Sequence, residues 1–150
     1  MNAGEMTPVE RALERLGGIA TTAELLHAGI PVDWIAMAWA YGRIVRIRKG
    51  WYARLDVPDA VIRAVRVGGR LACQSALDFH DGRSLDLGPL HVSVPRRASR
   101  LRTVFNARQR LAEYPDDDLR VHWTRSEPSG DRWAVSREEA QEQASRCWLA

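Results

Sequence analysis

The stretch RIVRIRKGWYAR, residues 43–54, constrains the fold of this chain more than any other. Apolar and basic residues alternate up to the pair Lys49-Gly50, and a second run begins with two aromatic residues. Alternation places successive side chains on opposite faces of a strand, so we expect Val45 and Ile47 to share one face and the arginines to take the other. A Lys-Gly pair between two such runs is typical of a tight turn. The stretch predicts a two-stranded hairpin.

Three helices are expected before this hairpin, at residues 8–16, 22–28 and 31–41. Proline stands near the start of the first and third, and glycine follows all three, as helix boundaries favour. Thr21 precedes Glu24 by three residues, which is the capping-box pattern for the second helix. Helix, helix, turn, helix and hairpin follow one another in a winged helix-turn-helix. We therefore predict that fold for residues 5–56.

The segment GGIATTAELLHAGIPVDWIAMAWAYGRIVRIRKGWYAR resembles the N-terminal winged-helix module of AbiEi-family antitoxins. The same module heads many actinobacterial proteins that end in a very-short-patch-repair-like nuclease domain. Further along, LACQSALDFHDG, LHVSVPRRASRLR and RVHWTR resemble the segments that follow the module, so the resemblance covers about residues 8–125. Its most specific part is the motif formed by Gly42, Arg43, Ile44, Arg46, Ile47, Lys49, Gly50 and Tyr52.

The resemblance implies a DNA-binding module that contacts operator DNA, together with a C-terminal domain that helps to neutralise a nucleotidyltransferase toxin. Double-stranded DNA and a cognate toxin are thus the implied partners, and a palindromic operator would require a homodimer. The metal site of the related nucleases needs more chain than follows the matched part. We therefore expect no nuclease activity.

The third expected helix departs from this pattern, because residues 31–41 contain no arginine or lysine to read base edges. We expect an inward stripe of Val32, Ile35, Ala36 and Trp39. An acidic and aromatic set would then face elsewhere, namely Asp33, Trp34, Met37, Ala38 and Tyr41. Two interpretations of Trp34, Met37 and Tyr41 stay open. They pack in the core or against the second half of the chain, or they bind a protein partner.

The net charge of +3 is modest, but the basic residues gather in two places. Either set contacts DNA phosphates, or it is a solvated face of an arginine-rich protein. Similarly, Trp51 and Tyr52 either stack on bases or pack against the helices, and a hairpin start favours packing. The first basic set is Arg43, Arg46, Arg48, Lys49 and Arg54, and the second includes Arg96, Arg97, Arg100 and Arg102.

Residues 57–150 are expected to form a small antitoxin-like α+β domain. Helical spacing predicts helices at 59–69 and 72–80, and alternation predicts strands at 88–95 and 118–125. A short strand and a last helix should follow, the helix starting at the capping box Ser136-x-x-Glu139, with Trp148 and Leu149 docking its end. The whole chain is thus predicted to be α+β.

The sequence lacks the signals of several classes of protein and of several kinds of site. No apolar run approaches the length of a membrane span and no signal peptide opens the chain, so we expect a cytoplasmic protein. Cys73 and Cys147 stand far apart without a CxxC motif, which suggests neither a disulfide framework nor a zinc site. No phosphate loop or hydrolase motif occurs, so we expect no enzyme, metal or cofactor. The four histidines lack a ligand partner at close spacing and are interpreted as structural: His27, His80, His91 and His122.

Two functional hypotheses follow. In the first, the chain is a DNA-binding transcriptional regulator of antitoxin type, whose wing and flanking arginines neutralise phosphates. In the second, it is a protein-interaction module on a winged-helix scaffold that binds a toxin or a host protein through Trp34, Met37 and Tyr41.

Overall fold

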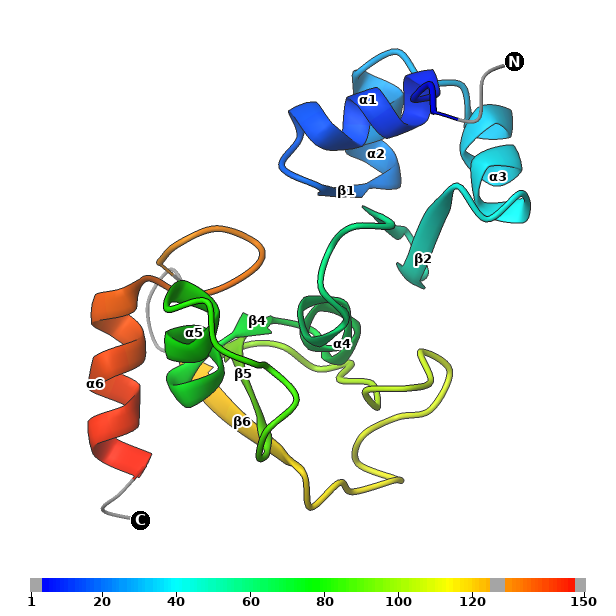
Figure 1. Ribbon diagram of the computed structural model, residues 1–150. Coiled ribbons are helices and arrows are strands. Elements are labelled where there is room, and N and C mark those ends of the chain that lie inside the picture. Colours follow the sequence, from blue (N-terminus) through cyan, green and yellow to red (C-terminus); the bar gives the residue numbers. More distant parts are fainter. Residues whose placement is uncertain (1–3, 125–128, 148–150) are drawn as a thin grey trace. The chain divides into compact units, whose positions relative to one another are not determined.

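The computed structural model describes residues 4–124 and 129–147 of the chain. These residues form two compact units, Met1–Val57 and Pro58–Ala150, which are treated separately below. Figure 1 shows helices and strands in both units. The sheet of each unit has three strands. The α+β class expected from the sequence is confirmed. No helix in the described ranges is long and apolar enough to cross a bilayer.

The N-terminal unit places three helices beside a small antiparallel sheet. Its central strand is β3 (Trp51–Arg54), which pairs with β1 (Ile19–Thr21) on one side and β2 (Ile44–Arg48) on the other. Strand β1 was not expected, because three residues are too few to show a period. Its hydrogen-bond partner β3 lies some thirty residues away, and that pairing defines it. The helices are α1 (Pro8–Arg15), α2 (Thr22–His27) and α3 (Val32–Ala40).

Capping boxes begin the first two helices. The Thr21 side chain accepts a hydrogen bond from the Glu24 amide at 3.2 Å, and the Glu24 carboxylate accepts one from the Thr21 amide at 2.9 Å. Thr7 and Glu10 form the same reciprocal pair at the start of α1. Each box satisfies two amides that would otherwise lack partners at a helix end. The predicted start of the second helix is confirmed.

The core of this unit is built from all three helices and the sheet. Leu13, Leu25 and Ile35 are almost fully buried within it, and Ile44 and Tyr52 join them from the sheet. Tyr52 thus packs against the helices, as a hairpin start favours. Trp51 is half-buried.

The hairpin differs from the alternation that its sequence suggests. A register shift between Arg46 and Arg48 interrupts the pairing of β2 with β3, as in a β-bulge. Ile44 and Ile47 are buried, whereas Val45 is only half-buried. The expected shared face of Val45 and Ile47 is therefore wrong, because an extra residue in one strand shifts the alternation by one position.

The C-terminal unit contains a second, mixed sheet. Strand β5 (Leu90–Pro95) lies in the middle, antiparallel to β4 (Arg70–Leu71) and parallel to β6 (Leu119–Thr124). A parallel pair requires a long crossover, and residues 96–118 supply it. The helices are α4 (Asp59–Val67), α5 (Cys73–His80) and α6 (Arg137–Cys147), of which α5 and α6 pack together.

Strand β5 is buried on both faces, since Val92, Ser93 and Val94 are each at most 2% exposed. The Ser136 hydroxyl accepts a hydrogen bond from the Glu139 amide at 3.2 Å, so one half of the predicted capping box of the last helix forms. The Glu139 carboxylate instead accepts a hydrogen bond from the Ser129 amide at 3.2 Å. The short strand expected before that helix is reduced to a single bridge between Leu71 and Ala134. Trp148 and Leu149 lie outside the described residues.

Candidate functional site

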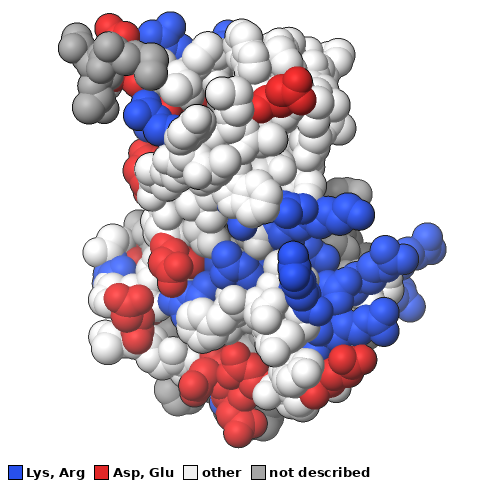
Figure 2. Space-filling view, turned by 90° about the vertical axis from the view of Figure 1, so that its right-hand side faces the viewer, with Lys and Arg blue, Asp and Glu red and all other residues white. Residues whose placement is uncertain are grey.

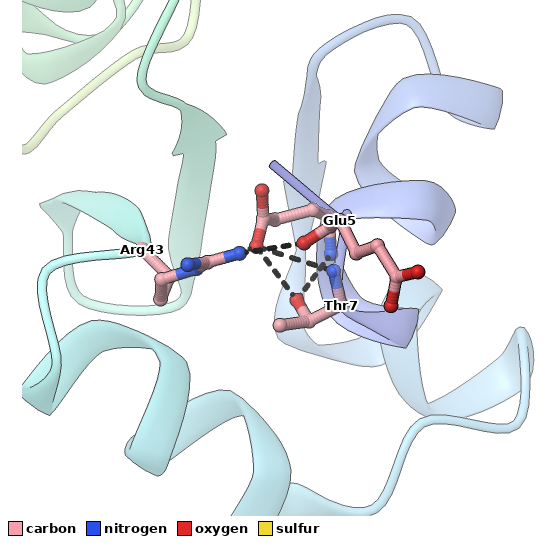
Figure 3. A network of polar contacts seen from close by, with 4 residues as sticks. Glu5, Thr7 and Arg43 are labelled. Carbon is pink, nitrogen blue, oxygen red and sulfur yellow. Dashed lines mark hydrogen bonds and ion pairs between the residues drawn. The ribbon is translucent and has the colours of Figure 1, made fainter. Parts of the chain in front are cut away.

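Arg43 begins the hairpin but is held inside the N-terminal unit. Its Nε donates to a carboxylate oxygen of Glu10 at 2.9 Å, and its Nη2 donates to the carbonyl oxygen of Glu5 at 2.9 Å. Figure 3 shows the guanidinium directed at the start of α1, beside Glu5 and Thr7. Burial raises the pKa of Glu10, but hydrogen bonds from Arg43 and Thr7 outweigh it and the net pKa is lowered. Glu10 stays ionised at neutral pH, so Arg43 forms an ion pair with it.

Arg54 ends the hairpin and is also engaged. Its guanidinium lies 3.5 Å from a carboxylate oxygen of Glu14 and 3.3 Å from one of Asp56. Arg43 and Arg54, both expected to contact phosphates, therefore neutralise acidic groups of their own unit. A phosphate would have to compete with those carboxylates.

The remaining hairpin cations are Arg46, Arg48 and Lys49, which surround the turn. The guanidinium carbon of Arg46 lies 4.7 Å from the centre of the Trp39 ring, a cation–π contact between β2 and α3. Arg46 and Arg48 are half-buried and Lys49 is exposed. The stacking restrains the Arg46 side chain, so an anion that bound there would cost it less conformational entropy.

Helix α3 presents an apolar surface rather than a buried stripe. Trp34, Met37 and Tyr41 are 48%, 54% and 76% exposed. None of the three is therefore a core residue of its unit. In Figure 2 the surface of the N-terminal unit that faces the viewer is mostly uncharged.

The predicted inward stripe of α3 is wrong in part. Only Ile35 and Ala38 are buried, whereas Val32 and Trp39 are 58% and 46% exposed and Ala36 is exposed as well. A helix of nine residues that touches the core along one narrow line buries positions three apart and little else. Because apolar residues lie on nearly every side of α3, the sequence periodicity does not determine which side is buried.

The second basic set lies on the crossover between β5 and β6. Arg96, Arg97 and Arg100 are exposed and Arg102 is half-buried. Basic side chains gather on one side of the C-terminal unit in Figure 2. A hollow of about 760 Å³ adjoins this segment, and Arg100, Arg110 and Trp123 are among its lining residues. The structure thus keeps these arginines accessible.

A group of cysteines and histidines converges in the C-terminal unit. Cys73 begins α5, His91 lies on β5, His122 lies on β6 and Cys147 ends α6. One sulfur or ring nitrogen from each lies within 4.8 Å of the others. We call these four residues the Cys/His cluster. The sequence interpretation treated each one as isolated, because their separations along the chain show no ligand motif.

The Cys/His cluster is partly shielded from solvent, since Cys73 is buried and the other three residues are half-buried. Burial raises the pKa of the Cys73 thiol to about 12, with a further contribution from Cys147. Burial also lowers the pKa of His91 to about 4, helped by the charges of His122 and Arg120, and burial lowers the pKa of His122. The Cys73 thiol and the two imidazoles are therefore uncharged at pH 7, and the imidazole nitrogens are able to act as ligands.

Comparison with known proteins assigns the chain to no family. A scan against protein-family models finds no match, and a search of curated proteins finds no match either.

Proposed function

We propose that the N-terminal unit is a winged helix-turn-helix module that binds double-stranded DNA in a transcriptional regulator of antitoxin type. The observation that carries this proposal is the order α1, β1, α2, α3, β2, β3 with sheet order β1-β3-β2. In this arrangement α2 and α3 are the helix-turn-helix pair, and the β2–β3 hairpin is the wing. The resemblance to antitoxin modules in residues 17–54 supports the same function.

The proposed contact is with the DNA backbone. Arg46, Arg48 and Lys49 surround the wing turn, where a hairpin meets phosphates, and such contacts position a protein without reading sequence. Helix α3 carries no cation, so it is poorly suited to read guanine edges. The arginines of the crossover, Arg96 to Arg102, extend the basic surface of the second unit in this proposal. Binding should therefore be strongly dependent on salt.

Removal of two wing cations tests the proposal. We expect Arg46→Ala combined with Arg48→Ala to weaken binding to a random-sequence duplex at least tenfold at about 50 mM salt. The slope of log K against log salt should become shallower by about two, one for each lost phosphate contact. Fluorescence anisotropy of a labelled duplex across a salt series measures both.

The matched control is Arg11→Ala combined with Arg15→Ala, which removes two exposed cations from α1. This variant has the same net charge as the wing variant, so a purely global charge effect would weaken both equally. Equal loss in the two variants, or no binding by the wild-type chain at low salt, contradicts the DNA proposal.

A second candidate function is protein binding, which the exposed apolar face of α3 favours. Trp34, Met37 and Tyr41 together present a surface of the kind that protein interfaces use, with tryptophan and tyrosine enriched at their energetic centres. A toxin or host protein is the proposed partner in this case. DNA and protein binding use different residues of one unit, so variants separate them.

We expect Trp34→Ala to weaken binding of a purified partner by thirtyfold or more, on the order of 2 kcal/mol, because it removes a central aromatic contact. The partner would be isolated with the full chain, identified by mass spectrometry and tested by calorimetry in purified form. Leu26→Ala, on α2 and 47% exposed, is the control for loss of an exposed apolar side chain. Unchanged affinity in Trp34→Ala contradicts this function.

A further inference from the structure

We propose that Cys73, His91, His122 and Cys147 form a tetrahedral site for a divalent metal ion, most suited to Zn²⁺, which stabilises the C-terminal unit. This site is independent of the DNA and protein surfaces of the N-terminal unit. All four residues belong to the unit Pro58–Ala150.

The sheet brings the two histidines together. Strands β5 and β6 are parallel, and Ser93 is paired with His122 across them. His91 lies two residues before Ser93 and therefore on the same face of β5. Both imidazoles project from that face, and Nδ1 of His91 lies 2.9 Å from Nε2 of His122. This register places two nitrogen ligands side by side.

The ends of two helices bring in the cysteines. Cys73 is the first residue of α5 and Cys147 is the last residue of α6, and their sulfurs lie 3.2 Å apart. The Cys73 amide donates to the side-chain oxygen of Gln143 on α6 at 2.9 Å, which ties the two helices together at this point. The Cys147 sulfur also lies 3.7 Å from Nε2 of His122. Sulfur and nitrogen atoms thus face a common centre.

The backbone at Cys73 is unusual. Among the non-glycine residues that the structure describes, Cys73 is the one with a positive φ, which is 50°. A side chain in this left-handed region costs free energy, and such conformations persist where the surroundings demand them. The conformation here places the thiol at the start of α5 within reach of the other three ligands.

The separations suit zinc coordination. Zn–S bonds of about 2.3 Å and Zn–N bonds of about 2.0–2.1 Å give a tetrahedron with edges of roughly 3.3–3.8 Å. Three of the six pairs of ligand atoms are separated by 2.9, 3.2 and 3.7 Å, and all six pairs lie within 4.8 Å. Shifts of up to about one ångström, within the reach of side-chain rotation, would convert the cluster into a ligand shell.

The donor set indicates the metal and its role. Two cysteines and two histidines in tetrahedral array favour Zn²⁺ over Mg²⁺ or Ca²⁺, which prefer oxygen ligands. Binding releases one proton from each thiol, and the two thiolates neutralise the charge of the ion. Four protein ligands leave no open position, so the site would be structural and not catalytic. The ion would join both helices to both parallel strands.

A disulfide between Cys73 and Cys147 is the competing use of the same sulfurs. It would require the sulfurs to approach to about 2.05 Å and would give the two histidines no role. A variant that lacks one histidine but keeps both cysteines distinguishes the alternatives, because only the metal site needs His122.

The test uses the full chain, purified with a reductant and without chelators. We expect native mass spectrometry and elemental analysis to find one zinc ion per chain. Replacement by Co²⁺ should produce the visible d–d bands of tetrahedral cobalt and a thiolate-to-metal charge-transfer band. Zinc removal by a chelator should lower the thermal midpoint, and added Zn²⁺ should restore it.

Single-ligand variants complete the test. We expect His122→Ala and Cys73→Ser each to weaken Zn²⁺ binding more than about 100-fold, since loss of an outer-shell partner alone can cost that much. His27→Ala, on α2 of the other unit, is the control and should bind zinc as the wild-type chain does. Should a variant fail to fold, the cobalt spectrum of the wild-type chain still decides.

Three results would overturn the proposal. The first is a folded, reduced wild-type chain that binds neither Zn²⁺ nor Co²⁺ in equimolar amount. The second is a Cys73–Cys147 disulfide in the chain purified with reductant. The third is His122→Ala that binds the metal as tightly as the wild-type chain.

Discussion

Gly69→Ala is expected to unfold the C-terminal unit, with a loss of more than about 4 kcal/mol in the free energy of unfolding. A Cβ atom at this position would lie 1.8 Å from the carbonyl oxygen of Ser93 and 2.7 Å from its carbonyl carbon. Both atoms belong to the backbone of the central strand β5, so no side-chain rotation relieves the contact. The β4–β5 pairing of Arg70 with Ser93 would have to open.

Chemical denaturation of the full chain, followed by circular dichroism, measures this loss. Two glycines provide controls within the same chain. At Gly88, where φ is +76° and the space is open, alanine should cost only about 1 kcal/mol of backbone strain. At Gly4, where a Cβ atom would meet nothing within 4 Å, alanine should leave stability unchanged. A Gly69→Ala variant as stable as Gly88→Ala would show that the close approach is not rigid.

Ile35→Ala should destabilise the N-terminal unit by about 2–4 kcal/mol, whereas Trp34→Ala on the same helix should change its stability by less than about 0.5 kcal/mol. Ile35 is 2% exposed, and with Ala38 it provides the buried contacts of α3, so its truncation leaves a cavity. Trp34 is 48% exposed and is the larger side chain. The smaller residue is therefore the one that stability needs.

Thermal and urea unfolding of the two variants measure the difference. A large loss of stability in Trp34→Ala would mean that this ring packs against structure, and the exposed face of α3 would then be a packing surface. The expected result instead leaves Trp34→Ala as a folded variant. Its use in the binding experiment of the second candidate function depends on that result.

Local signals were sufficient for most of the helices and strands. The Thr21 and Glu24 capping box forms as expected, and the hairpin turns at Lys49-Gly50. Strands β1 and β4 were missed because each contains three residues or fewer, and partners far along the chain stabilise them. A bulge that depends on strand pairing also altered which side of β2 is buried.

The candidate sites likewise have features that the sequence shows and features that depend on the fold. The arginines of the hairpin are visible in the sequence, but Arg43 and Arg54 turn out to neutralise carboxylates on α1 and beside β3. His91 and His122 lie in segments predicted as strands, and their convergence depends on a parallel register that no local pattern encodes. The only available signal was a histidine in each of two predicted strands.

What the sequence by itself determined is local: where helices begin and end, where the hairpin turns, and that cations gather on two segments. These features depend on caps, glycine conformations and periodicity, which act over a few residues. Only the tertiary structure decided which line of α3 is buried, which arginines are already paired, and that Cys73, His91, His122 and Cys147 meet. Those outcomes depend on contacts between residues distant in the chain, and such contacts exist only once the units have folded.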